Sequence, residues 1–433
     1  KRKDKIKIQE IRIYLKKISG FRKIKIYERK VNFGLSKNII TGLNKLKKIY
    51  SFGNLFVSNF VTKEKIKKSI RAPLNFVHCK RCDLLQLEHS APQELLYRGF
   101  YWYRSGVTST MIKGLKDIYS AGKKIAKLKK NDVVLDIGAN DGTLLKFFKK
   151  DGIKTLGCEP AKNLTSELKK NCDIVMNDFW TIENFKKIQK KNNLKKPKLV
   201  TAIGMFYDLE KPSKFISDVA ESMDDNGVFI AQLMCLKSML SKNDLGNICH
   251  EHLEFYSYKS LVYLFENNGL QVIKVEENDI NAGSYRIFCK KKITKSIKIK
   301  EQTSKKDVMN FIKRVNLSKE KCTNFINNEI KKGKTVFVYG ASTKGNTVLQ
   351  YFDLGSKQIP YAAERSPQKW GKYTVGSGIK IISEEEARKK NPDYFFVLPW
   401  AFMDEFVKRE DKWLRDGGKF IVPFPKFKIY SKT

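Results

Sequence analysis

Two series of short apolar runs, separated by segments of helical periodicity, constrain the fold of this chain more than any other feature. The first series begins near Asp132 and comprises residues 133–137, 155–158, 174–176, 199–203 and 228–232. The second comprises residues 335–339, 361–364, 394–398 and 419–422. Parallel strands covered on both faces by helices give such runs, so the sequence predicts two α/β units built on mostly parallel sheets.

Three domains are expected, because 433 residues exceed what one hydrophobic core supports. The first ninety or so residues carry short alternating runs and two closely spaced cysteines, which predicts a small β-rich module. A stretch rich in Lys, Ser and Thr between Lys290 and Lys306 indicates a linker. We therefore expect an N-terminal module at 1–95, a Rossmann-like unit at 96–295 and a second Rossmann-like unit at 296–433.

The formal net charge of +41 raises the question of a nucleic-acid partner. The lysines occur in every segment, including predicted helix faces such as 123–130. This scatter favours a general compositional bias, with an anionic small substrate or RNA as the alternatives. We expect no nucleic-acid partner.

A cytoplasmic location is predicted from three features. Eight cysteines in a chain of this length are too few for a dense disulfide framework. The first thirty residues are charged throughout and do not read as a secretory signal. No run of eighteen uncharged apolar residues occurs, so no membrane span is expected. The expected state is a monomer or a dimer.

The strongest ligand-binding signal is the turn after the first apolar run, where Asp136, Gly138 and Gly142 are spaced as Asp-x-Gly-x-x-x-Gly around Asn140. The glycines let the backbone approach a ligand, and the following helix offers free N–H groups. The carboxylate before the turn can act on an amino acid ammonium directly or through water. This arrangement favours S-adenosylmethionine over a dinucleotide, with turn capping by Asp136 as the alternative.

Acidic residues also follow the next two predicted strands. Glu159 lies about twenty residues beyond the turn, where a carboxylate can accept hydrogen bonds from both ribose hydroxyls. Asp178 could bind an adenine amino group, and Phe179 would cover the face of the ring. Capping of a turn is the alternative role of Asp178.

Two of the four histidines, His250 and His252, flank Glu251. Residues i and i+2 of an extended segment face one side. The motif could therefore place an imidazole beside a substrate carbon as a general base, oriented by Glu251 or a neighbour. A metal pair and ordinary packing are the alternatives.

Three other segments carry candidate ligands. The aromatic stretch 97–105 suits a pocket for a flat or polyhydroxylated anion, or else core packing. Residues 340–346 form a glycine-containing turn before a helix, where Lys344 could contact a phosphate, and a dinucleotide site is the competing interpretation. Cys79 and Cys82 form half of a four-ligand zinc site without an evident second pair, so zinc and two plain thiols both stay open.

Taken together, residues 101–106, 136–142, 250–253, 339–346 and 398–400 resemble the family of S-adenosylmethionine-dependent nucleotide-sugar C-methyltransferases. The resemblance covers nearly the whole chain, and the motifs occur in the family's order. It implies a zinc-binding N-terminal domain, a central class I methyltransferase domain and a C-terminal Rossmann-like domain that helps to hold a nucleotide-linked 4-keto-6-deoxyhexose. The implied reaction is C-methylation next to the ketone, in the biosynthesis of deoxysugars or surface glycans.

The resemblance also implies roles for particular residues. The second histidine of the family's Tyr-His-Glu-His motif is the proposed base, which corresponds to His252 here. Cys249 replaces the tyrosine, so the role of its hydroxyl is lost or passes to Tyr256. The family's first Cys pair corresponds to residues 32–35, which hold no thiols and suggest a degenerate or metal-free module. The expected substrate-binding residues are Tyr101, Tyr103, Arg104, Ser105, Gly340, Ser342, Lys344, Asn346, Glu364 and Arg365.

Two other classes of function are considered. An enzyme that methylates RNA or another small molecule would use the same cofactor domain, but an RNA enzyme should interleave basic and aromatic residues along one surface. A noncatalytic relative would keep the folds and lose activity. The intact motifs at 136–142 and 250–252 argue against this last alternative.

Overall fold

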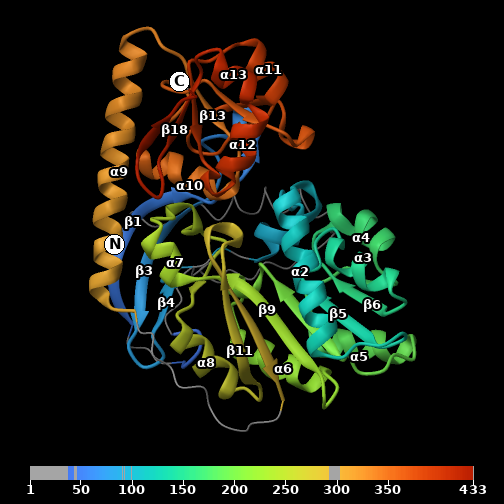
Figure 1. Ribbon diagram of the computed structural model, residues 1–433. Coiled ribbons are helices and arrows are strands. Elements are labelled where there is room, and N and C mark those ends of the chain that lie inside the picture. Colours follow the sequence, from blue (N-terminus) through green and yellow to red (C-terminus); the bar gives the residue numbers. More distant parts are fainter. Residues whose placement is uncertain are drawn as a thin grey trace.

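The computed structural model describes residues 38–42, 46–89, 91, 93–98, 100–291 and 303–432 (Figure 1). A seven-stranded sheet forms the core of the middle of the chain, an eight-stranded sheet forms the core of its end, and a four-stranded sheet lies beside both. Most of the predicted linker between Lys290 and Lys306 lies outside the described residues, as does the segment 32–35.

The seven-stranded sheet has the order β11-β12-β9-β8-β5-β6-β7. Its five parallel strands are β5 (Val133–Ile137), β6 (Lys154–Cys158), β7 (Ile174–Met176), β8 (Leu199–Ile203) and β9 (Val228–Met234). The antiparallel strands β11 (Gln271–Asn278) and β12 (Ser284–Lys290) close one edge. Strands β6 and β7 extend the sheet on one side of β5, and β8 and β9 extend it on the other side. This reversal of strand order leaves a crevice at the carboxyl ends of β5 and β8.

Helices cover both faces of this sheet. Successive residues of β5 point to opposite faces, so Val134 packs in an apolar cluster with α2 (Ser109–Ile125) and α3 (Thr143–Lys150). Leu135 packs instead with α5 (Ile182–Lys191) and α6 (Pro212–Ser222). The class I methyltransferase fold expected from the sequence is therefore present.

The C-terminal unit is a second α/β sheet of order β19-β18-β17-β13-β14-β16-β15-β2. Its parallel strands are β13 (Val336–Tyr339), β14 (Tyr361–Glu364), β16 (Lys380–Ser383), β17 (Tyr394–Val397) and β18 (Lys419–Val422). Antiparallel strands β15 (Tyr373–Thr374) and β19 (Lys428–Tyr430) flank them. The helices of this unit are α10 (Thr343–Phe352), α11 (Glu384–Lys389), α12 (Met403–Arg409) and α13 (Asp411–Arg415).

The N-terminal module shares strands with both α/β units. Its sheet contains β1 (Lys47–Phe56), β3 (Arg71–Cys79) and β4 (Leu84–Leu87), and β10 (Glu254–Phe255) of the middle unit pairs with β4. Its remaining strand β2 (Phe60–Val61) pairs with β15 at the edge of the C-terminal sheet. The Gln350 side chain also pairs with the backbone N–H and C=O of Phe56, at 2.7 and 3.1 Å.

The long helix α9 (Lys305–Lys331) links the two α/β units along one side of the molecule (Figure 1). A capping box of Ser304 and Asp307 fixes its start. Arg314 binds the Asn243 side chain and the Leu240 carbonyl at 2.8 and 2.7 Å, which attaches the helix to the methyltransferase unit.

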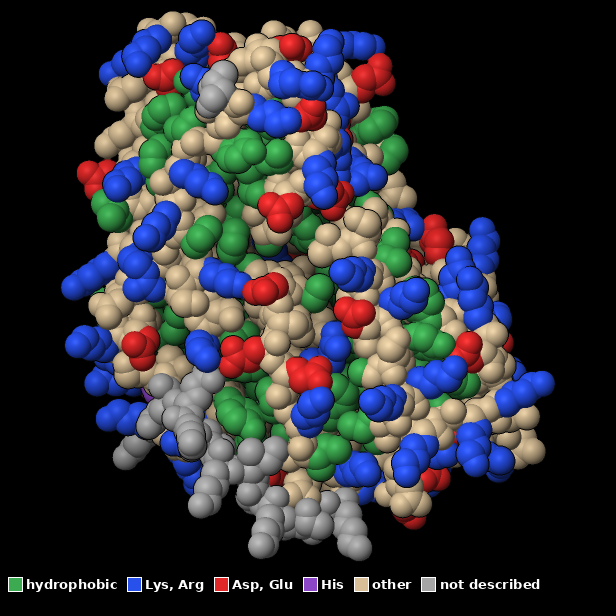
Figure 2. Space-filling view, in the orientation of Figure 1, with side chains coloured by type: hydrophobic (Ala, Val, Ile, Leu, Met, Phe, Trp, Pro, Cys, Tyr) green, Lys and Arg blue, Asp and Glu red, His purple; other side chains and the backbone are tan. Residues whose placement is uncertain are grey.

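Charged side chains are dispersed over the surface. Figure 2 shows Lys and Arg across the whole visible face, interspersed with Asp and Glu. No helix within the described ranges is both long and apolar enough to cross a bilayer.

A buried carboxylate stabilises the C-terminal unit, and its removal should be costly. Glu410 accepts hydrogen bonds from the Tyr339 hydroxyl at 2.6 Å and from the Arg388 guanidinium at 2.6 and 2.8 Å. Glu410→Ala leaves the Tyr339 hydroxyl buried without this partner, so we expect a loss of about 2–3 kcal/mol of stability. Urea unfolding measures this loss. Glu385→Ala, which removes the exposed pair with Lys389, is the matched control and should leave the midpoint unchanged.

Candidate active site

A cavity of about 380 Å³ lies between the two α/β units. The methyltransferase unit lines it with residues at the carboxyl ends of β5, β6, β8 and β9. The C-terminal unit lines it with residues 342–344 after β13 and 398–402 after β17. The binding edges of two parallel sheets therefore face one another across a single cavity.

Asp136 is the penultimate residue of β5 and lies at the wall of this cavity. Its Oδ1 accepts a hydrogen bond of 2.6 Å from the Thr201 hydroxyl, and burial raises the pKa of the Asp136 carboxyl to about 7. Gly138 follows with a φ of +76°, and a Cβ atom there would lie 2.7 Å from the Met205 side chain. Both the backbone conformation and the close approach therefore require glycine at this point of the turn.

The Glu159 carboxylate stabilises the same turn from the end of β6. Its Oε2 accepts a hydrogen bond from the Asn140 N–H and its Oε1 accepts one from the Ala161 N–H, both at 2.9 Å. Burial raises the pKa of Glu159. Each carboxylate oxygen can accept a further hydrogen bond, so the side chain can hold two hydroxyls of a ribose while it fixes the turn.

The segment 101–105 contacts the glycine turn after β5. The Asn140 side chain accepts a hydrogen bond from the Ser105 N–H at 3.0 Å and donates one to the Tyr103 carbonyl at 3.1 Å. Tyr103 and Ser105, expected to bind substrate, thus line the cavity next to the glycine turn after β5, together with Tyr101. Arg104 lies outside the lining, because its guanidinium pairs with Glu167 at 2.7 Å.

Two expected cofactor residues also lie outside the cavity lining. Gly142, with a φ of +77°, precedes α3, and a Cβ atom there would lie 2.8 Å from the Asn171 side chain, so its role is close packing. Asp178 is half-exposed and pairs with Arg98 at 2.5 Å. Phe179 does line the cavity, and the Arg98 guanidinium lies 5.3 Å from the centre of its ring.

His252 points into the cavity with one ring nitrogen free. Its Nδ1 lies 2.8 Å from the Asn247 carbonyl, which can only accept, so Nδ1 carries the proton and Nε2 keeps its lone pair. Tyr207 packs edge-on against the ring at 4.6 Å between centroids. Burial, followed by the charge of Lys344, lowers the pKa of His252 to about 3. The imidazole is therefore neutral at neutral pH.

His250 and Tyr256 are not at this cavity. Residues 249–251 form a turn, closed by a hydrogen bond from the His252 N–H to the Cys249 carbonyl, so the two imidazoles point in different directions. The extended geometry expected for this segment is wrong. His250 is buried with Nε2 3.0 Å from the Ala72 carbonyl of β3, and Tyr256 packs in the main apolar core. The two histidines therefore do not form the metal pair considered as an alternative.

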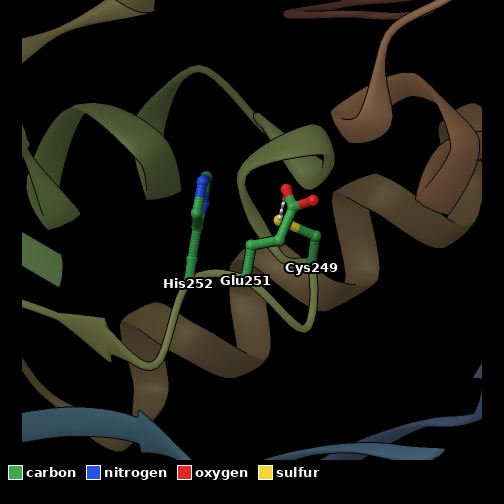
Figure 3. A group of neighbouring side chains, drawn as sticks. All are labelled: Cys249, Glu251 and His252. Carbon is green, nitrogen blue, oxygen red and sulfur yellow. Dashed lines mark hydrogen bonds between the residues drawn. The ribbon is translucent and has the colours of Figure 1, made fainter. Parts of the chain in front are cut away.

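Glu251 lies beside His252 without orienting it. Figure 3 shows the Glu251 side chain turned toward Cys249, whose thiol lies 3.8 Å from Oε2. Burial raises the pKa of Glu251 to about 7. Ligand atoms of Cys249, Glu251 and His252 lie within 4.8 Å of one another. The positive charge of Lys344 acts on both Glu251 and His252 and opposes the binding of a divalent cation among them.

Tyr207 and Asp208 line the cavity just after β8 and were not predicted from the sequence. Asp208 is buried, and its Oδ1 has no hydrogen-bond partner among the described residues. Burial, and then the Glu251 carboxyl, raises the pKa of Asp208 well above its usual range. Their place after the strand 199–203, at the same sheet edge as Asp136, is the signal that could have found them.

The first turn of α10 forms the opposite wall. Ser342 caps this helix by accepting a hydrogen bond from the Gly345 N–H at 2.9 Å. Lys344 extends to the methyltransferase unit, where its ammonium donates to the Asn247 side chain at 2.6 Å. Both residues line the cavity.

The other expected residues of the C-terminal unit lie away from the cavity. Glu364 pairs with Lys369 at 3.1 Å, and Arg365 pairs with Glu405 at 3.4 Å. Asn346 is fully buried within α10. The expected residues outside the cavity lining are Gly340, Asn346, Glu364 and Arg365. The end of β14 therefore does not border the cavity as the dinucleotide interpretation would require.

Comparisons with known proteins find a family model on each of the two α/β units. A family model described as a methyltransferase domain matches residues 110–275, and the chain is an S-adenosylmethionine-dependent methyltransferase. A second, described as a C-methyltransferase C-terminal domain, matches residues 280–425. The C-methyltransferase NovU of Streptomyces niveus is 28% identical over 371 residues, which cover 83% of this chain and 88% of that protein. The two family models thus match consecutive parts of the chain, the methyltransferase domain first and the C-methyltransferase C-terminal domain second.

Solved structures of other methyltransferases match the middle unit with low scores. Magnesium protoporphyrin IX methyltransferase from Synechocystis with bound S-adenosylmethionine is 12% identical, covering 42% of this chain and 79% of its own, with a TM-score of 0.31. An S-adenosylmethionine-dependent methyltransferase from Clostridium acetobutylicum is 14% identical, covering 41% and 91%, with a TM-score of 0.32. The assignment rests on the family models and the curated relative, not on these structures.

Cofactor affinity should depend on the ionisation of Asp136. We propose that this carboxylate receives the cofactor's ammonium group, so a proton must leave Asp136 on binding below its pKa of about 7. The affinity for S-adenosylhomocysteine should then rise with pH toward 7, by up to about tenfold per pH unit. Calorimetric titration between pH 5.5 and 8 measures this slope, and Asp136→Asn should flatten it. A wild-type affinity independent of pH would contradict the assignment.

Proposed function

We propose that this enzyme transfers a methyl group from S-adenosylmethionine to the carbon next to the ketone of a nucleotide-linked keto-deoxy sugar, with His252 as the general base. The observation that carries the proposal is the placement of His252. The free Nε2 of His252 faces the cavity. One end of this cavity is the glycine turn after β5, which we propose binds the cofactor, and the other end is the first turn of α10. A base between a methyl donor and a second ligand is what C-methylation of an acidic carbon requires.

The C-terminal wall supports an anionic substrate. Lys344 and the start of α10 both favour negative charge, since helix N-termini and ammonium groups bind phosphates. The resemblance in sequence suggests the identity of this anionic substrate, a nucleotide-linked 4-keto-6-deoxyhexose. The cavity has the size of a small-molecule site, for which volumes of about 300–1,000 Å³ are usual.

The base is proposed to become effective only when substrate is bound. Protonation of His252 is disfavoured first by burial and second by the nearby charge of Lys344. A diphosphate paired with Lys344 would offset that charge and raise the pKa of the imidazole. The Asn247 carbonyl would then stabilise the imidazolium through the Nδ1–H bond at 2.8 Å. Removal of a proton from carbon would thus be coupled to the presence of the correct anion.

The reaction can be followed through the residues of the chain. Bound S-adenosylmethionine supplies the electrophilic methyl group on its sulfonium sulfur. His252 Nε2 takes the proton from the carbon next to the ketone, and the electron pair of that C–H bond moves into an enolate. Buried hydroxyl and carboxyl groups that line the cavity, Tyr207 and Asp208 among them, can donate hydrogen bonds to the enolate oxygen. The nucleophilic carbon of that enolate would accept the methyl group that the cofactor supplies when it is bound.

We also propose a cytoplasmic location for this reaction. All eight cysteines are present as free thiols, which suits a reducing compartment.

The base assignment predicts a selective loss in one histidine variant. His252→Gln should lower the methylation rate by about 100-fold or more, the usual contribution of a general base. It should equally slow exchange of the acidic C–H for deuterium, measured by NMR with a nucleotide-linked 4-keto-6-deoxyhexose, while S-adenosylhomocysteine still binds. His250→Gln changes the neighbouring imidazole that contacts β3 and serves as the matched control. Full exchange activity in His252→Gln would rule out this residue as the base.

The substrate class predicts which ligand Lys344 recognises. Calorimetric titration with nucleoside diphosphates, in the presence of S-adenosylhomocysteine, should show selective binding that Lys344→Met weakens about tenfold or more. Lys357→Met, which changes a lysine outside the cavity lining, should leave the affinity unchanged. Tight, strongly salt-dependent binding of a short RNA, without selectivity among the nucleotides, would support an RNA methyltransferase instead.

A further inference from the structure

Two turns of equal spacing meet at the end of the N-terminal module. Asn38 and Thr41 are separated by two residues, as are Cys79 and Cys82. Each turn is followed by a residue in the left-handed region, Gly42 with a φ of +67° and Asp83 with a φ of +59°. The structure thus places an Asn-x-x-Thr turn opposite the Cys-x-x-Cys turn, at the position where a zinc module would supply its second pair of thiolates.

Hydrogen bonds join the two turns directly. Asn38 Oδ1 accepts from the Thr41 N–H and hydroxyl, both at 2.8 Å, and from the Cys82 thiol at 3.5 Å. Thr41 Oγ1 lies 3.9 Å from the Cys79 sulfur. Because the threonine hydroxyl donates its proton to Asn38, the Cys79 thiol is the donor in this last contact. Each of the four side chains therefore takes part in a hydrogen bond within the cluster, and both thiols keep their protons.

These residues do not fit a zinc ion. Tetrahedral ligands at about 2.3 Å from zinc lie roughly 3.8 Å apart, which is close to the separations seen here, but structural sites are built from Cys and His. Asn38 and Thr41 are neutral oxygen donors, and Asn38 Oδ1 already accepts three hydrogen bonds. Asn38 is buried, and its amide N–H donates to Gln86 Oε1 at 2.9 Å, which holds its oxygen toward the thiols.

We infer that the N-terminal module is closed by a hydrogen-bonded cluster of Asn38, Thr41, Cys79 and Cys82 in the place of a zinc ion, and that it keeps its fold without metal. In this inference Asn38 and Thr41 take the place of the second pair of thiolates that the resemblance implies. The cluster contacts the catalytic turn through β4, since Gln86 pairs with Glu254 of β10, two residues beyond His252. The position of the proposed base would then be independent of zinc supply.

Metal analysis of the full-length protein tests the inference. Purified wild-type protein should contain no stoichiometric zinc by mass spectrometry, and incubation with a chelator should leave its Tm unchanged. Added Co²⁺ should give no thiolate-to-cobalt absorption band. Stoichiometric zinc together with a fall in Tm on chelation would overturn the inference.

A double substitution provides the positive control. Asn38→Cys with Thr41→Cys restores four thiols at zinc spacing, so this variant should bind Co²⁺ with a tetrahedral thiolate spectrum and gain Tm when zinc is added. Asn38→Ala should lower Tm by the same amount with and without chelator, because it removes hydrogen bonds only. If the double variant fails to fold, the inference is still tested by the zinc content of the wild-type protein and by the Tm of Asn38→Ala with and without chelator. A zinc-dependent Tm in Asn38→Ala would count against the inference.

Discussion

Exchange of short strands between sheets fixes the geometry on which the site depends. Strand β2 of the N-terminal module extends the C-terminal sheet, and β10 of the methyltransferase unit extends the sheet of the module. Backbone hydrogen bonds of a ladder tolerate little sliding, because a slip of one residue turns every side chain to the other face. The module therefore holds the two α/β units in one relative position, and the cavity lies between them.

The same attachment explains why the proposed base is so well buried. His252 lies two residues before β10, so its backbone is fixed by the module while its ring enters the cavity. Lys344 of the C-terminal unit then bonds to Asn247, whose carbonyl holds the His252 ring. Each of the three parts of the chain thus contributes to the position of one imidazole. Because His252 is buried, charges near it interact strongly, so an anionic ligand at Lys344 can act on His252 across the cavity.

Sequence patterns correctly predicted features that depend on neighbouring residues in the chain, such as strand positions. The strands at 133–137, 174–176 and 199–203 have the predicted bounds, and Asp136 and Glu159 lie at the expected sheet edge. The patterns failed where contacts between residues far apart in the sequence determine the position of a side chain. The turn at 249–251 separates His250 from His252, and Glu364 is paired with Lys369, which no spacing rule shows. Strand β11 was missed because it is only partly buried beyond Val272 and its run is mostly polar. Strand β12 is buried, but Ser284 and Arg286 interrupt its apolar run.

The residues that face Cys79 and Cys82 are a further example of contacts between distant parts of the chain. The sequence places Cys79 and Cys82 next to no other thiols, and only the fold shows that Asn38 and Thr41 face them. A metal would bind four thiolates strongly, and losing two of them removes most of that binding energy. Neutral hydrogen bonds are individually weaker, but the cluster need not hold the module alone. The strands β2 and β10 already join it to two large sheets, so the scaffold can stay closed with less local stabilisation than an isolated zinc module requires.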